Sequence, residues 1–417
     1  MKFDTLQLNS RLLHSIRDRG YTEMTEVQEK TLAQTLEGRD VAVQSQTGTG
    51  KTAAFLITLY EMMLKNRPGQ RGKALIIVPT RELAVQIEEE ADLLNHHTDF
   101  SICSFFGGVG YDKQLDALRK GVDIAIGTPG RLIDLSQKRY LKLNEYRYIV
   151  IDEADRLFDM GFLPDIQTLI QSMPPKQNRY SMLFSATLNR ASRQLAYEHL
   201  MDPVFIEVTP EQMTVESITQ ELYHVKSHIK LNLMLGILKR DNPKNALVFT
   251  NTRHKALDLA KRLTANGYKA RHITGDLPQN KRLQVMDDFK AGRFGFLVAT
   301  DVAARGLQID GLEMVINYDV PEDCENYVHR IGRTARMGKT GKAVTLASER
   351  TFLHQDAIED FIGERIPVLE PDSSLYETDK SLQAVITRKF QKFGSRRESS
   401  HSRRGGASRQ SQRRSRS

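Results

Sequence analysis

The sequence contains only two cysteines, no tryptophan and no long apolar run. Cys103 and Cys324 lie far apart and outside any metal-ligand spacing, which predicts two free thiols in a reducing compartment rather than a disulfide framework. No stretch of 18 apolar residues occurs, and the start MKFDTLQLNSRLL lacks the apolar segment of a signal peptide. These absences predict a cytoplasmic protein with no membrane partner.

The composition, 40% hydrophobic and 27% charged over 417 residues, is typical of a soluble globular protein, and the length favours two domains plus extensions. The net charge of +8 is concentrated at one end. Residues 388–417 hold eleven Lys or Arg and one acid, Glu398, for a net +10, which leaves −2 for residues 1–387. Because this Arg/Ser/Gly-rich tail has almost no aliphatic residues, we expect it to be disordered.

Short β-rich runs alternate with helix-length amphipathic stretches, which predicts βα units and parallel sheets. The rhythm breaks near residue 208 and then restarts, which indicates two α/β sheets joined by a linker. The expected strands span residues 40–44, 73–78, 122–126, 148–151 and 181–185 before the break, and 245–250, 294–300, 313–319 and 341–347 after it. The expected divisions are a first domain 1–207, a linker 208–219, a second domain 220–368, and an extension with the basic tail 369–417.

A phosphate-binding loop is predicted at residues 44–52, QSQTGTGKT, between the first strand and an amphipathic helix. Gly48 and Gly50 would let backbone N–H groups surround a polyphosphate at the helix N-terminus. Lys51 would reach the β- and γ-phosphates, and the Thr52 hydroxyl would bind Mg²⁺. The alternative is a glycine-rich turn that only caps a helix.

Three carboxylates follow the buried strand YIVI, namely Asp152, Glu153 and Asp155. Burying them is unfavourable unless a cation lies opposite. In a nucleotide-hydrolysing fold, Asp152 would meet the Mg²⁺ bound with ATP and Glu153 would orient or deprotonate the attacking water. An acidic helix N-cap is the rival interpretation, and it explains Asp155 better than the other two.

The segment HRIGRTARMG, residues 329–338, places Arg330, Arg333 and Arg336 near one helical face. The alternative is that this basic helical face is only a solvent-exposed surface. Because transferring phosphate is usually stabilised by a guanidinium, we predict a cleft whose two walls come from different domains.

Together these motifs make residues 1–368 resemble the DEAD-box ATP-dependent RNA helicases, and Asp152-Glu153-Ala154-Asp155 spells the family name. The resemblance implies two tandem RecA-like domains, each a parallel sheet flanked by helices, with ATP and Mg²⁺ as cofactors. It implies that GYTEMTEVQ (20–28) recognises adenine, with Gln28 reading the base edge and Phe3 or Tyr21 supporting the ring. It also implies that Arg333 and Arg336 are arginine fingers.

The resemblance assigns further positions to nucleotide, RNA and coupling roles. The nucleotide set is completed by Ser45, Gln46, Thr47, Thr49, Gly306 and Gln308. The implied RNA contacts are Pro79, Thr80, Arg81, Gly107, Gly108, Thr128, Pro129, Gly130, Arg131, Thr250, Arg253, Gln279, Arg282, Thr300 and Asp301. Asp155, Ser185, Thr187 and His329 are implied to couple hydrolysis to strand separation. Few aromatics interleave with these motifs, which favours backbone contacts without sequence specificity.

The sequence departs from the family at Gln308, where an Asp that touches the ribose is usual. Within the family the chain looks most like the bacterial RhlB type, which implies mRNA turnover beside an endoribonuclease, and we expect a monomer. Three functions stay open: a helicase that separates short RNA duplexes, an ATP-gated RNA clamp, and a DNA translocase. The basic tail is either a solubilising appendage or a non-specific RNA tether.

Overall fold

The computed structural model describes residues 1–45, 48–66, 72–208, 218–304, 309, 311–335, 340–349 and 351–381. The expected nucleotide and arginine-finger positions Gln46, Thr47, Gly306, Gln308 and Arg336 lie outside these ranges, as do most of the expected linker and the basic tail. No helix of the described part is long and apolar enough to cross a membrane.

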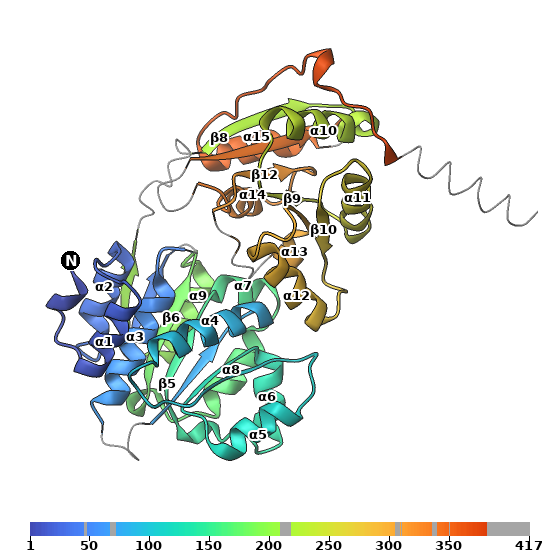
Figure 1. Ribbon diagram of the computed structural model, residues 1–417. Helices are drawn as coiled ribbons and strands as arrows, with labels where there is room; N and C mark the ends of the chain where they lie inside the picture. Colours follow the sequence, from blue (N-terminus) through green and yellow to red (C-terminus); the bar gives the residue numbers. More distant parts are fainter. Residues whose placement is uncertain are drawn as a thin grey trace, which may run out of the picture.

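The chain forms two α/β units, the first coloured blue to green in Figure 1 and the second yellow-green to red. The first has a seven-stranded sheet in the order β3-β4-β2-β5-β6-β1-β7. Its strands are β1 (Val41–Gln44), β2 (Lys73–Ile77), β3 (Ile102–Phe105), β4 (Ile124–Gly127), β5 (Tyr146–Ile151), β6 (Tyr180–Ser185) and β7 (Val204–Glu207). The second sheet has six strands in the order β10-β11-β9-β12-β13-β8. They are β8 (Ile218–His224), β9 (Ala246–Phe249), β10 (Ala270–Ile273), β11 (Phe296–Ala299), β12 (Met314–Asn317) and β13 (Gly341–Ala347).

Helices cover the sheets. In the first unit they are α1 (Ser10–Asp18), α2 (Glu26–Thr35), α3 (Lys51–Leu64), α4 (Arg81–Leu94), α5 (Asp112–Lys120), α6 (Pro129–Gln137), α7 (Ala154–Asp159), α8 (Leu163–Gln171) and α9 (Arg190–His199). In the second they are α10 (Lys230–Asp241), α11 (Arg253–Ala265), α12 (Gln279–Lys290), α13 (Asp301–Ala304), α14 (Cys324–Ile331) and α15 (Phe352–Ile362). The two tandem RecA-like sheets expected from the sequence are therefore confirmed.

Every pairing between the named strands is parallel, so the sheets are apolar on both faces. In β1, Val41 and Val43 enter one core cluster while Ala42 enters the cluster on the opposite face. In β9, Ala246 and Leu247 divide between two clusters in the same way. Parallel strands end at one common edge, and the predicted motifs follow the carboxyl ends of these strands.

The chain beyond α15 remains attached to the second unit. Leu222 in β8 bonds to Pro367 and Leu369 through its backbone. The Asp379 carboxylate accepts hydrogen bonds from Arg262 on α11 at 2.6 Å and from Asn266, the C-cap of that helix, at 2.7 Å. Residues 369–381, the part of the expected extension that the structure describes, therefore follow the surface of this unit as far as α11.

Candidate ATP and RNA site

The phosphate loop and the acidic motif meet through a buried ion pair. Lys51, the first residue of α3, places its Nζ 2.8 Å from Asp152 Oδ1, just beyond β5. Full burial lowers the pKa of Lys51, but Asp152 and Glu153 outweigh this effect and raise it, so the ammonium stays charged. The expected adjacency of the glycine loop and the carboxylates is thus present in the structure.

Two buried oxygens beside this pair lack a hydrogen-bond partner among the described residues, namely Asp152 Oδ2 and Ser45 Oγ. A buried acceptor without a partner is unfavourable, and it indicates a position that a ligand completes. Thr52, in the first turn of α3, is also buried. A hydroxyl and a carboxylate are hard oxygen ligands of the kind that Mg²⁺ prefers, so the residues present fit a Mg²⁺–phosphate group.

The expected adenine segment is attached to the phosphate loop. Thr25 caps α2 in a capping box with Gln28, and its hydroxyl donates to Thr49 O at 2.8 Å. The Gln28 amide donates to Gly50 O at 3.2 Å and accepts from Thr25 N–H at 2.9 Å. A Cβ on Gly50 would lie 2.4 Å from Gln28 Nε2, and Gly50 has a φ of +91°, so only glycine fits there. Gln28 therefore links the expected adenine segment to the phosphate loop.

The two aromatic residues expected to support adenine contact each other. The Phe3 and Tyr21 rings stack with centroids 5.9 Å apart. Tyr21 donates its hydroxyl to Glu90 on α4 at 3.2 Å, which fixes this ring at the edge of the first unit.

Glu153 occupies a strained and highly charged position. Its φ of 53° is left-handed, a conformation that is unfavourable for a non-glycine residue. Arg156 Nη1 donates to Glu153 Oε2 at 2.9 Å, and both side chains are buried. Burial raises the pKa of Glu153, but Arg156, Lys51 and Arg333 outweigh it and hold that pKa below its ordinary value. Glu153 is therefore an ionised carboxylate at neutral pH.

Arg333 brings the second unit to this carboxylate. It lies just after α14 and is buried, and its charge acts on Glu153 across the two units. The structure thus places Arg333, an expected finger, beside the acidic motif; Arg336 lies outside the described residues. His329, expected to couple the motifs, is half-buried on α14.

The expected coupling pair Asp155 and Ser185 is in direct contact. Ser185 donates its hydroxyl to Asp155 Oδ1 at 3.0 Å and accepts the Asp155 N–H at 3.1 Å. Ser185 ends β6, and Thr187 follows two residues later, half-buried. The end of β6 is therefore joined to the first turn of α7, beside the two catalytic candidates.

The expected RNA contacts of the first unit gather at the carboxyl ends of its strands. Thr80 caps α4, Arg81 is the first residue of that helix, and Thr128 precedes α6. A Cβ on Gly108 would meet Arg81 Nη1 at 2.1 Å, so the glycine leaves room for that guanidinium. Pro79 and Pro129 are buried, whereas Gly107 is half-buried and Gly130 exposed.

The Arg131 guanidinium is already bonded to partners within the first unit, unlike an arginine that only binds phosphate. It donates to Gln114 Oε1 at 3.0 Å and to Val109 O at 3.3 Å, and it lies 4.2 Å from the Tyr111 ring centroid. These contacts fix the loop after β3. Because Gly107 and Gly108 lie in this loop, Arg131 supports their position.

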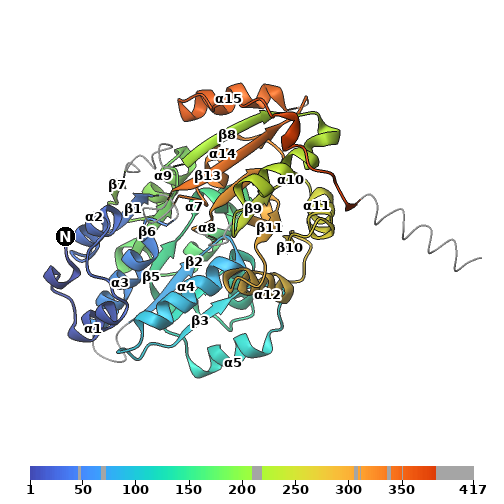
Figure 2. The same ribbon diagram turned by 45° about the horizontal axis from the view of Figure 1, so that its top comes forward.

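The second unit repeats the Thr–Arg arrangement. Thr252 caps α11, which begins at Arg253, and Arg253 is exposed. Thr250 and Thr300 are buried at the ends of β9 and β11. Gln279 and Arg282 lie on α12 and contact the first unit: Gln279 Nε2 donates to Glu82 Oε1 at 3.1 Å, and Arg282 Nε lies 2.9 Å from the same oxygen. Figure 2 shows α12 beside α4, which carries Glu82.

Sequence reasoning missed two supporting residues, Arg156 and Glu82, and it expected Arg330 on a basic helical face, which is wrong because Arg330 is buried. Arg330 is almost fully buried and grips Asp301 through two bonds of 2.6 Å. It also donates to Asn251 Oδ1 and to Asp319 O, so it fixes the expected RNA residue Asp301 rather than facing solvent. The spacing of three residues between Glu153 and Arg156 was the only available signal for these partners.

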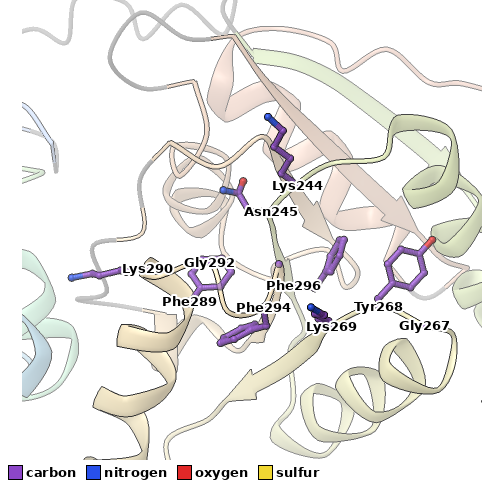
Figure 3. Close-up of a pocket in the computed structure, with 11 residues that line it drawn as sticks. Lys244, Asn245, Gly267, Tyr268, Lys269, Phe289, Lys290, Gly292, Phe294 and Phe296 are labelled. Carbon is purple, nitrogen blue, oxygen red and sulfur yellow. The ribbon is translucent and has the colours of Figure 1, made fainter.

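A cavity of about 480 Å³ lies away from this site, at the amino ends of β9 and β11. It is lined by Lys244, Asn245, Gly267, Tyr268, Lys269, Phe289, Lys290, Gly292, Phe294, Gly295 and Phe296, none of them an expected site residue. Figure 3 shows the Lys290 side chain directed away from the rings, so the lysines do not converge on one ligand position.

Comparison with known proteins gives a consistent result. A model described as DEAD/DEAH box helicase matches residues 25–195, and one described as helicase conserved C-terminal domain matches residues 229–338. The ATP-dependent RNA helicase RhlB of Klebsiella pneumoniae (strain 342) is 44% identical over 93% of this chain and 94% of its own. RhlB of Pectobacterium carotovorum is 43% identical over 93% and 91%.

Solved structures agree. S. cerevisiae Dbp5 bound to RNA and ADP BeF3 has a TM-score of 0.77 at 28% identity, covering 88% of this chain and 95% of that one. Mss116p bound to ssRNA and AMP-PNP has a TM-score of 0.79 at 30% identity, covering 90% and 81%. In this chain Lys51 pairs with Asp152, and the charge of Arg333 from the second unit acts on the neighbouring Glu153. The chain belongs to the DEAD/DEAH box helicase family and is an ATP-dependent RNA helicase that hydrolyses ATP.

Proposed function

We propose that the protein uses Mg²⁺-dependent, RNA-stimulated ATP hydrolysis to separate short RNA duplexes locally. The observation that carries this proposal is the convergence of Lys51, Glu153 and Arg333 from two units on one buried position. Such a site is complete only when the units are closed, so RNA that bridges them would promote hydrolysis.

In the proposed mechanism, Lys51 binds the β- and γ-phosphates, and Glu153, kept ionised by Arg156, orients the attacking water and accepts its proton. Arg333 stabilises the charge that develops on the transferred phosphoryl group. Thr52 and Asp152 would hold Mg²⁺, which neutralises phosphate charge when bound. The Asp155–Ser185 hydrogen bond would transmit the structural change that follows hydrolysis to β6 and to the expected RNA contacts.

RNA is proposed to bind through its backbone at the helix starts that Thr80–Arg81 and Thr252–Arg253 form. Helix N-termini and arginines contact phosphates without reading bases, and 2′-hydroxyl contacts would favour RNA over DNA. The similarity of this chain to Dbp5 bound to RNA and ADP BeF3 supports RNA as the bound polymer.

Steady-state ATP hydrolysis without polymer, with single-stranded RNA and with matched DNA tests the proposal. Stimulation by RNA alone is expected. Equal stimulation by DNA would favour the translocase, and RNA stimulation without duplex release would favour the ATP-gated clamp.

We also propose a cytoplasmic role in mRNA turnover, as a monomer working beside an endoribonuclease, which is what the resemblance to the RhlB type implies; the similarity to helicases named RhlB supports that type. Co-purification of tagged chain with an endoribonuclease, and its loss when the interaction is competed, would test this role. A chain that elutes alone and monomeric from cell extract would argue against the assembly.

The basic tail, residues 388–417, is proposed as a non-specific RNA tether. Its eleven Lys or Arg would release counterions from phosphates, so its deletion should weaken RNA affinity and flatten the salt dependence while RNA-saturated hydrolysis persists. An unchanged salt slope in the truncated chain would exclude the tether.

A further inference from the structure

Three histidines and one aspartate gather where α1 ends beside the end of α4. His14 and Asp18 lie four residues apart on α1, which places them on one face of the helix. His96 and His97 follow α4 in the turn after its last residues. None of the four belongs to the nucleotide or RNA motifs.

The potential ligand atoms are close together. His97 Nε2 lies 2.7 Å from Asp18 Oδ2, and the ligand atoms of Asp18, His96 and His97 all lie within 4.8 Å of one another. The His97 ring centroid is 4.8 Å from that of His96 and 5.7 Å from that of His14. In a tetrahedral site with bonds of about 2.0 Å, ligand atoms are about 3.3 Å apart, so small side-chain rotations suffice.

The backbone at this position is already fixed. Arg11 Nε donates to His97 O at 2.6 Å, and His97 N–H donates to the Ser15 hydroxyl at 3.3 Å. Binding an ion would therefore order only side chains, which keeps the entropy loss small. The His97 and Asp18 side chains are 38% and 56% exposed, so an ion can reach them from solvent.

Nearby positive charges are compensated. Arg11 pairs with Asp99 at 3.5 Å, and Arg17 pairs with Asp4 at 2.9 Å. Each of these carboxylates offsets the repulsion between its arginine and a bound cation. A His–Asp hydrogen bond alone would explain His97 and Asp18, but it leaves the position of His96 beside the same ligand atoms unexplained.

We propose that Asp18, His96 and His97 bind a borderline transition-metal ion of the Zn²⁺ class, with the His14 ring packed against His97. Imidazole with one carboxylate suits Zn²⁺, Co²⁺ or Ni²⁺, whereas Mg²⁺ requires oxygen ligands. The ion joins α1 to α4. Because Tyr21 follows α1 and bonds to Glu90 on α4, the metal fixes the helix pair that carries the expected adenine support.

Co²⁺ titration of the chelator-treated full-length chain, in excess Mg²⁺, tests the site. Visible d–d absorption reports an ordered coordination sphere, and calorimetry with Zn²⁺ gives the stoichiometry. We expect one ion per chain and an affinity at least about 10-fold lower in His96→Ala and in Asp18→Asn. His228→Ala, which removes an exposed histidine of the second unit, should bind normally.

The absorption spectrum distinguishes the proposed site from one in which a cysteine binds the metal. Burial raises the pKa of the Cys103 thiol to about 12, so it remains protonated at neutral pH, and a thiolate ligand would add intense charge-transfer absorption. Zn²⁺ should also raise the unfolding temperature of the parent but not of His96→Ala. Equal Zn²⁺ affinity in the parent and in His96→Ala, or no stoichiometric binding by the parent, would overturn the proposal.

Discussion

At the residue scale, Glu153 shows how one side chain can be kept ionised inside a protein. It is buried in a left-handed conformation, and both features are unfavourable by themselves. Three cations from three different segments reverse the effect of burial on its pKa. Arg156 is the nearest, and it acts on Glu153 rather than on substrate, so we assign it a positioning role.

Replacing Arg156 with methionine should raise the pKa of Glu153, because burial would be less compensated. A raised pKa moves the acid limb of the pH profile of kcat to higher pH, and hydrolysis at neutral pH should fall by about 10-fold or more. The pH dependence of ATP hydrolysis measures both effects.

Arg190→Met, a change at an exposed arginine, is the control for that variant. An acid limb at the same pH in Arg156→Met and the parent would show that Arg156 does not tune Glu153.

At the scale of elements, the strands that the sequence predicted and those that it missed differ in one respect. The nine predicted strands are all present, with bounds shifted by up to a few residues. The four missed strands are β3, β7, β8 and β10, and these are the edges of the two sheets. An edge strand is half-solvated, and segments such as ARHI and ITQELYH therefore lack the continuous apolar run of a buried strand.

The attachment of residues 369–381 was not predictable for a related reason. It depends on polar contacts and on one close approach rather than on apolar periodicity. The carbonyl of Leu375 lies so near α10 that a Cβ on Gly236 would be 1.6 Å from its oxygen. Only the folded structure reveals why glycine stands in the middle of that helix.

Gly236→Ala should therefore displace this segment from α10 and destabilise the second unit by about 1–3 kcal/mol. Limited proteolysis should then cut within 364–381 faster than in the parent. Gly275→Ala, at a position with open space around it, is the matched control. Unchanged cleavage rates would mean that the segment is not held by this contact.

Asp379 makes the stability of the same segment depend on pH. Its interactions with Arg262, Asn266 and Ser381 outweigh burial and lower its pKa to about 2 from an ordinary value of 3.8. A lowered carboxylate pKa stabilises the fold above pH 4, and this contribution is lost as the pH falls from about 4 to about 2.

Asp379→Asn should accordingly destabilise the protein by about 1–2 kcal/mol at pH 7 and by less near pH 3. Unfolding midpoints of the parent and the variant at both pH values measure the difference. A difference that stays constant between pH 7 and pH 3 would refute the linkage.

At the scale of the whole molecule, the sequence predicted the motifs but not the contacts between them. The phosphate loop, the acidic motif and the arginine segment 329–338 were each recognisable from local pattern, although α14 ends at Ile331 and Arg333 lies beyond it. The contact of Gln279 and Arg282 with Glu82 joins residues nearly two hundred positions apart, and no local pattern encodes it. The pairing of Lys51 with Asp152 was predictable only because parallel strands share one carboxyl edge.

Arg333→Ala tests whether the two units share one catalytic site. Hydrolysis should slow by about 10³-fold, because the developing phosphate charge loses its partner, while nucleotide affinity changes little. Lys51→Ala should show the opposite balance, with weakened ATP binding as its main effect. Single-turnover hydrolysis and equilibrium binding of a fluorescent ATP analogue separate the two, and normal turnover in Arg333→Ala would refute the shared site.

The strand order has a consequence for synthesis on the ribosome. Every partner of β1 lies before residue 208, so the first sheet can close while the second unit is still unmade. In the second sheet, β8 pairs with β13 and bridges to Val368 on its other side. The first strand of that unit must therefore wait for almost all of it to be translated, and during that interval the nascent chain carries an unpaired strand beside a finished domain.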